Sequence, residues 1–98
     1  MADYKNPMTD KLFSAISSLT TPEQCRLFFE DLCTIKEIQD MAQRLEVALL
    51  LSQGKSYLEV SARTGVSTAT ISRVNKCLSY GAGGYAGVIK FLTAGNED

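Results

Sequence analysis

The segment Ser56–Tyr80 constrains the fold most, because it carries start and stop signals for two helices around a very short turn. Ser56 and Glu59 have the spacing of a capping box, which predicts the start of the first helix. Gly65 can end that helix, since glycine adopts a positive φ without strain. Ser67 can then cap a second helix. The pattern predicts two helices that cross steeply.

The apolar residues of this segment fall where such a crossing needs them. Val60 lies one turn before the glycine and Val66 directly after it. Ile71, Val74 and Leu78 share one face of the second helix, because they are spaced three and four residues apart. This arrangement predicts a helix-turn-helix over about residues 56–80 whose inner side is a small core.

The opposite face of the second helix is small, hydroxylated and basic. Hydroxyl groups can donate to phosphates or bases, an alanine can contact a thymine methyl group, and arginine can make a bidentate contact to guanine. The free N–H groups at a helix start attract phosphate. The first helix would cross the DNA backbone. We therefore expect contacts to double-stranded DNA from Lys55, Ser56, Tyr57, Ser67, Thr68, Ala69, Thr70, Ser72, Arg73 and Lys76.

The charge distribution agrees with this hypothesis, although the net charge of the chain is −1. Residues 54–80 carry a net charge of +3, from four basic residues against Glu59 alone, and the rest of the chain carries −4. A local positive surface on a mildly acidic body suits directed phosphate binding. The alternative is a solvated helical hairpin with a chance cluster of cations. The joint pattern of caps, glycine turn and a serine–arginine face favours DNA binding.

The remaining residues indicate an all-α chain. Residues 1–8 predict a flexible arm, and residues 94–98 a frayed C-terminus. Between them, 9–93 predict a single all-helical domain. Thr9, Thr21 and Thr34 have the features of helix starts, the last two with a glutamine or glutamate three residues later. A break near Thr34 is expected, as is a short closing helix over residues 85–92.

The central helix should run to about Gln53 and stop at Gly54. Its second half is apolar most of the way round, with Val47 to Leu51 as a continuous apolar run. Such a helix is buried on several sides. In a chain of 98 residues this favours burial against a second subunit, and a central helix in a monomer is the alternative.

The composition excludes several classes of site. Histidine is absent, which removes Ser-His-Asp and Cys-His catalytic pairs and histidine-based metal sites. Cys25, Cys33 and Cys77 are odd in number and form no C-x-x-C pair, which argues against disulfides and zinc. We therefore expect no enzyme, metal or cofactor. Without a leader or a long apolar run, we expect a cytoplasmic protein with no membrane contact.

The sequence resembles the Trp repressor superfamily. The resemblance rests on the string Gly65–Arg73 (GVSTATISR), on Arg44–Gly54, and on a Thr-Pro-Glu helix start at Thr21. The continuation Tyr80–Tyr85 is similar to the Trp-repressor-related YerC/YecD branch. This likeness, over about residues 9–93, implies an intertwined all-α homodimer that places two recognition helices in successive major grooves. The expected function is a transcription regulator, most simply a repressor.

The resemblance also implies a ligand site. In the Trp repressor, tryptophan lies between the central and recognition helices beside two arginines, whose positions match Arg44 and Arg73. This chain has Val74 where the repressor has a glycine, and Cys77 where a serine meets the ligand. A valine would occupy space that the indole needs, so we expect that tryptophan is not the effector. Whether another small-molecule effector binds at a site formed by Arg44, Arg73 and Cys77 is left open.

Two alternatives remain at this point. Arg44 can instead be an arginine that pairs along its own helix with Asp40 or Glu37. The chain as a whole can be a helical protein-interaction module that no longer binds DNA. Such a module would more often carry apolar residues in place of the exposed hydroxyls, Arg73 and Lys76.

Overall fold

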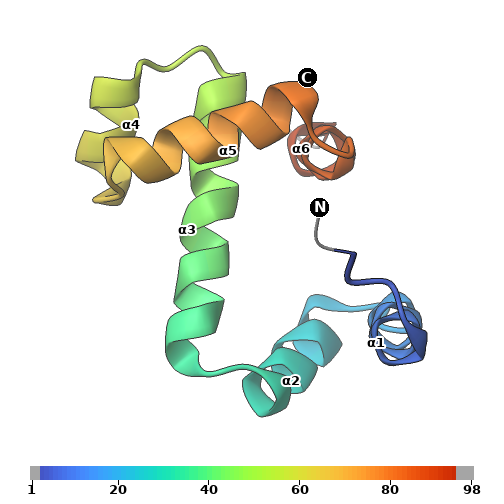
Figure 1. Ribbon diagram of the computed structural model, residues 1–98. Helices are drawn as coiled ribbons and strands as arrows, with labels where there is room; N and C mark the ends of the chain where they lie inside the picture. Colours follow the sequence, from blue (N-terminus) through green and yellow to red (C-terminus); the bar gives the residue numbers. More distant parts are fainter. Residues whose placement is uncertain (1–2, 95–98) are drawn as a thin grey trace. The chain divides into compact units, whose positions relative to one another are not determined.

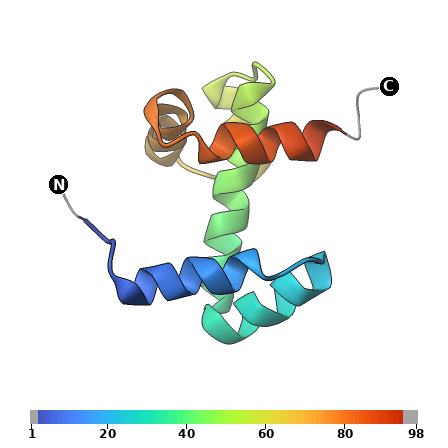
Figure 2. The same ribbon diagram turned by 90° about the vertical axis from the view of Figure 1, so that its right-hand side faces the viewer.

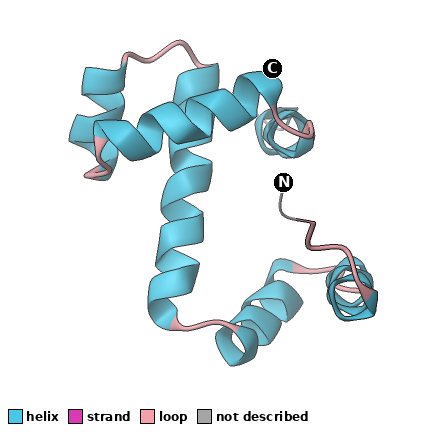
Figure 3. Cartoon of the chain, viewed as in Figure 1, coloured by secondary structure: helices cyan, strands magenta, loops and turns pink. Residues whose placement is uncertain are grey.

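The computed structural model describes residues 3–94, and every regular element within them is an α-helix, as the sequence predicts (Figure 3). Short loops connect the helices. Figure 1 labels them in chain order: α1 (Pro7–Ser17), α2 (Pro22–Leu32), α3 (Ile35–Ser52), α4 (Tyr57–Thr64), α5 (Thr68–Tyr80) and α6 (Gly84–Ala94). The chain divides into two compact units, one up to Ile38 and the other from Gln39 onward.

Polar caps start the helices largely where the sequence predicts. Thr34 makes a reciprocal capping box, since its Oγ1 accepts from the Glu37 backbone N at 3.1 Å and its own N donates to Glu37 Oε1 at 2.8 Å. This box separates α2 from α3 and confirms the predicted break. Ser56 Oγ accepts from the Glu59 backbone N at 3.1 Å at the start of α4. Gly54 has φ of 84° directly after the central helix.

The first helix begins earlier than predicted. Asn6, rather than Thr9, is the N-cap, and the two residues exchange side-chain-to-backbone hydrogen bonds of 3.0 Å in each direction. Pro7 takes the first helical position, where its missing N–H is not needed. The predicted arm over residues 1–8 is therefore wrong for residues 7 and 8.

Two other details differ from the predictions. At α2, Thr21 is the N-cap and Pro22 the first helical residue, as predicted, but Gln24 Oε1 accepts from the backbone N of Thr20 rather than from that of Thr21. At the C-terminus, α6 includes Ala94, which the sequence had placed in a frayed end. Residues 95–98 of that predicted end lie outside the described residues.

The N-terminal unit has a helical hairpin, α1 and α2, whose side chains are all at least partly exposed (Figure 2). Large apolar side chains lie in contact with solvent, including Met8 at 76%, Phe13 at 53% and Leu27 at 53% exposure. On the polar side of α2, Arg26 pairs with Glu23 and Glu30, and these hydrogen bonds raise the pKa of Arg26 above its ordinary value. The α1–α2 hairpin has no buried side chain of its own.

The C-terminal unit contains the core. Its buried side chains come from every helix around the turn: Val47, Ala48 and Leu50 of α3, Val60 of α4, Val66 of the turn, and Ile71 and Val74 of α5. The predicted inner side of the helix pair is thus confirmed, with Leu78 half-buried at its edge. Figure 1 shows α5 crossing α3 next to α4. None of the described helices is both long and apolar enough to span a membrane.

Candidate nucleic-acid interface

The turn between α4 and α5 is fixed by side chains from the α4 side. Gly65 ends α4 with φ 74° and ψ 6°, the left-handed conformation that glycine adopts most easily. Ser61 Oγ donates to the Val66 carbonyl oxygen at 2.9 Å, and the Val66 N donates to Thr64 Oγ1 at 3.2 Å. With Val66 also in the core, these bonds hold α5 at a set angle to α4.

The burial of α5 determines which of its faces is accessible. Ile71 and Val74 are 0% and 2% exposed, so the inner side of the helix is anchored in the core. The positions between them point the other way, because a helix advances 100° per residue. The exposed set contains Thr68, Ala69, Ser72, Arg73 and Lys76, all predicted to contact DNA.

At the start of α5, the Ser67 hydroxyl caps the helix. Ser67 Oγ accepts from the Thr70 backbone N at 3.3 Å and donates to Thr70 Oγ1 at 3.2 Å. Each hydroxyl has one proton, and one of the two is used in this contact, so the pair keeps one proton for a further acceptor. Ser67 is exposed and Thr70 is half-buried.

The residues before and at the start of α4 lie at the surface to different degrees. Ser56 is exposed and Tyr57 is 37% exposed, whereas Lys55 is half-buried and its backbone N donates to the Leu50 carbonyl oxygen at 3.2 Å. The side chain of Lys55 nevertheless keeps part of its surface in water. All ten predicted DNA contacts are thus at least partly accessible.

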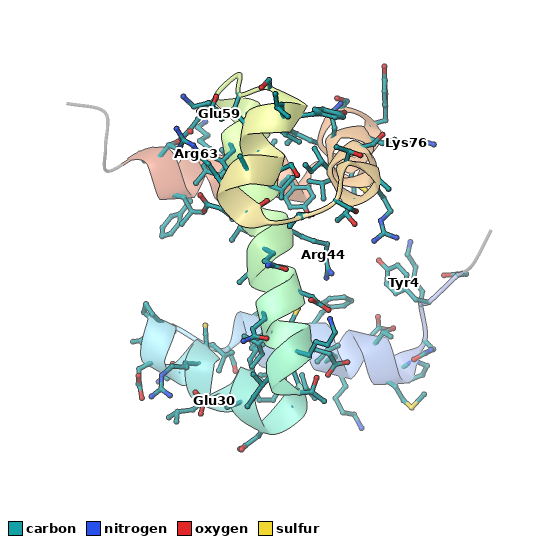
Figure 4. The ribbon with its side chains drawn as sticks, turned by 90° about the vertical axis from the view of Figure 1, so that its left-hand side faces the viewer. Tyr4, Glu30, Arg44, Glu59, Arg63 and Lys76 are labelled. Carbon is teal, nitrogen blue, oxygen red and sulfur yellow. The ribbon has the colours of Figure 1, made fainter. Side chains whose placement is uncertain are left out.

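One ion pair reduces the positive charge of the helix pair. Arg63 Nη2 lies 2.8 Å from Glu59 Oε2, one helical turn away on α4, and both labelled side chains lie together in Figure 4. The pair is neutral as a whole. The positive charge between residues 54 and 80 is therefore carried by Lys55, Arg73 and Lys76.

One edge of the exposed face of α5 lies next to α3. A cavity of about 210 Å³ is lined by Asp40, Gln43, Arg44, Val66, Thr70 and Arg73. The half-buried Arg44 projects from α3 toward the side on which α5 carries Lys76 (Figure 4). Gln43, which was not predicted as a site residue, donates from Nε2 to the Thr64 carbonyl oxygen over 3.5 Å. A polar surface of α3 thus adjoins the α5 face.

The three predicted effector residues do come together. Arg44, Arg73 and Cys77 line a second cavity of about 270 Å³, together with Val74 and Tyr85. Tyr85 was missed at the sequence level, where it was only the first residue of a closing helix. The signal that could have found it is the glycine-rich turn before it, which can reverse the chain onto α5. Cys77 is exposed and its thiol is free.

Metal-binding chemistry is not assembled in the described part of the chain. Within residues 3–94, no three side chains of the types His, Cys, Asp or Glu gather closely enough to hold an ion. The three cysteines are free thiols.

Comparisons with known proteins agree with this architecture. A family model described as Trp repressor protein matches residues 8–93. A protein of Bacillus subtilis (strain 168), named "Uncharacterized protein YerC", is 57% identical over 76 residues, which are 78% of this chain and 73% of that protein.

Two solved structures are also similar. The TrpR-like protein from Eubacterium eligens has a TM-score of 0.85 at 48% identity, covering 90% of this chain and 91% of that chain. A Staphylococcus aureus protein has the same TM-score at 42% identity, covering 90% and 88% of the two chains.

The helix order and the α4–α5 pair define an all-α helix-turn-helix protein with the Trp-repressor-like fold. The chain belongs to the Trp repressor family, a family of transcription regulators, on its YerC-like branch.

Proposed function

We propose that this protein is a sequence-specific regulator of transcription, a repressor, that binds double-stranded DNA as a homodimer and places α5 in the major groove. The observation that carries the proposal is the exposed face of α5, where Thr68, Ala69 and Ser72 leave room for close approach and Arg73 and Lys76 supply charge. A buried inner side holds this face rigidly, as base readout requires.

The first experiment selects bound sequences from a random pool of double-stranded DNA. A symmetric dimer should select a two-fold-related site whose half-sites are about one helical turn, ~10 base pairs, or a multiple of it apart. Failure to enrich any sequence, together with equal retention of all duplexes, would contradict sequence-specific readout. Absence of any DNA binding would favour the protein-interaction module instead.

The second experiment replaces Arg73 by alanine. If Arg73 contacts a base edge, the selected site should bind about 1–3 kcal/mol more weakly, and the preference at one position should relax. Gel-shift titration measures both effects. The matched control is the double variant Glu59→Gln/Arg63→Gln, which removes an exposed cation without changing the net charge and should bind normally. Unchanged affinity in Arg73→Ala would remove the proposed role.

The homodimer is supported by the N-terminal unit. Its hairpin has no buried side chain, while Phe13, Leu27, Leu32 and Ile35 are all more than half exposed. Units of about 40 residues rarely bury a sufficient core without a partner, and contiguous apolar surface marks interaction sites. In this proposal, the single domain predicted for residues 9–93 is completed by a second copy of the chain.

The proposed effector specificity excludes tryptophan. Val74 is 2% exposed and belongs to the core, so its side chain is fixed beside Arg44 and Arg73 rather than free to move aside. Calorimetric titration of tryptophan into the protein should give no binding heat at micromolar concentrations. Clear saturable heat would overturn this interpretation of Val74.

A further inference from the structure

The three-residue segment between α5 and α6, residues 81–83, turns the chain sharply in a way that needs glycine. A Cβ atom on Gly81 would lie 2.3 Å from the Cys77 carbonyl oxygen, so no other residue fits there without a shift of backbone. Gly83 has φ of 91°, which side chains rarely tolerate. Figure 1 shows α6 end-on beside the end of α5, and Figure 2 shows α6 passing across α3. At the start of α6, Tyr85 packs against the core.

Tyr85 is placed differently from its neighbours. It is half-buried and packs against the core, whereas Ala86, Gly87 and Val88 are exposed and Tyr80, just before the turn, is 86% exposed. Burial is thus specific to one of the two tyrosines around the turn.

Tyr85 of α6 lines the same cavity as Arg44 of α3 and Arg73, Val74 and Cys77 of α5. Tyr85 of α6 therefore borders both α3 and α5, next to the exposed Arg73. This cavity, about 270 Å³, is below the roughly 300–1,000 Å³ typical of sites for organic ligands. Tyr85 and Cys77 also border a larger hollow of about 540 Å³, but neither arginine lines it.

We propose that Tyr85 is a positioning residue that holds α5 in its DNA-binding orientation, so that DNA binding needs no small-molecule effector. This inference rests on the proposed function of α5. When a binding-competent orientation is only partly populated, the apparent affinity falls by that fraction. Tyr85, packed beside α3 and α5, keeps the binding-competent fraction of the protein high without a ligand. Removing the ring should lower DNA affinity because α5, which carries Arg73, is then held less firmly in its DNA-binding orientation. Tyr85 itself does not contact DNA.

The test uses the full chain, dialysed free of small molecules, and the DNA site selected above. Wild-type protein should bind this site without any addition. Tyr85→Ala should bind at least about tenfold more weakly, and Tyr85→Phe within about twofold of wild type, because the ring and not the hydroxyl does the packing.

The matched control is Ile89→Ala. Ile89 lies on the same helix, is half-buried and packs against the same core, but it does not line the cavity. It should lose stability and keep its DNA affinity within about twofold. Addition of p-cresol, the tyrosine side chain as a free molecule, should restore DNA binding to Tyr85→Ala and have no effect on Ile89→Ala.

A readout without DNA separates this inference from the proposed function. Cys77 lines the same cavity, so its rate of alkylation, followed by mass spectrometry of its peptide, reports how closely α6 covers α5. The rate should rise in Tyr85→Ala and fall again with p-cresol. If these changes occur but wild type binds no DNA, the proposed function fails and the packing role of Tyr85 stands.

Three results would overturn the inference. The first is normal DNA binding by Tyr85→Ala. The second is an equal loss in Ile89→Ala that p-cresol does not reverse in either variant, which would indicate a general role in stability. The third is wild-type binding that appears only after a small molecule is added.

Discussion

α1 and α5 begin with the same local device, yet the two helices differ in what holds them afterwards. Asn6 caps α1 by accepting from the Thr9 backbone N at 3.0 Å, and Ser67 caps α5 by accepting from the Thr70 backbone N at 3.3 Å. α1 buries no side chain, whereas α5 places Ile71 and Val74 in the core. Local signals therefore start both helices, but only α5 is fixed by packing within the chain.

The difference shows how the two units depend on their surroundings. Most helical stability in proteins comes from burial of an apolar face rather than from propensity or caps. The C-terminal unit meets this condition with a core drawn from α3, α4 and α5. The N-terminal unit has the apolar face but no buried side chain in α1 or α2. A rigid binding surface fits the C-terminal unit, and an association surface fits the N-terminal unit.

The largest effect that tests this comparison is expected at Ile71. Its side chain is fully buried, and Ile71→Ala should lower the free energy of unfolding by about 2–5 kcal/mol through lost transfer energy and a cavity. Urea unfolding followed by circular dichroism measures the change. Leu58→Ala is the control, because Leu58 of α4 is 82% exposed and should change stability by less than ~0.5 kcal/mol. Equal effects of the two variants would contradict the assigned core.

A smaller effect is expected at the association surface. Leu27→Glu should raise the dissociation constant of the dimer by at least about tenfold, since burial of a leucine contributes ~1.5–3 kcal/mol and a buried carboxylate costs more. Sedimentation equilibrium measures it, with Leu58→Glu as the control that leaves association unchanged. A wild-type chain that stays monomeric at every concentration would remove the proposed dimer.

The smallest effects are expected at the caps. Ser67→Ala should lower the free energy of unfolding by about 1 kcal/mol, because α5 belongs to the cooperative core. Asn6→Ala removes a cap of similar geometry from α1. It should speed amide exchange in the first turn of α1 more than it lowers global stability. Equal losses of global stability would show that α1 unfolds together with the core, and the contrast between the units would then be wrong.

Much of the fold followed from short-range signals. The break at Thr34, the starts at Ser56 and Ser67 and the stop at Gly65 were all predicted from capping chemistry, which acts within one turn. The predicted start of α1 at Thr9 was wrong, because Asn6 is the N-cap and Thr9 supplies the other half of the capping box. Pro7 was the signal that could have found this start, since proline suits the first helical position.

Some features of the candidate site were likewise predictable from the sequence, and others were not. Spacing alone put Ile71 and Val74 inside and Arg73 outside, because a helix of known start fixes its own faces. No spacing rule relates Gln43 to the Thr64 carbonyl oxygen or brings Tyr85 and Arg44 to the same cavity, since these residues lie on helices far apart in the chain.

The sequence by itself therefore determined that residues 56–80 form two capped helices around Gly65, and which face of the second one is polar. It also determined the class of the chain through the string that ends at Arg73. Only the tertiary structure decided that Gln43 of α3 reaches the Thr64 carbonyl oxygen at the end of α4, because this contact depends on how the two helices pack. The return of Tyr85 onto α5 was likewise decided by packing, because turn residues permit a reversal but the core selects its direction.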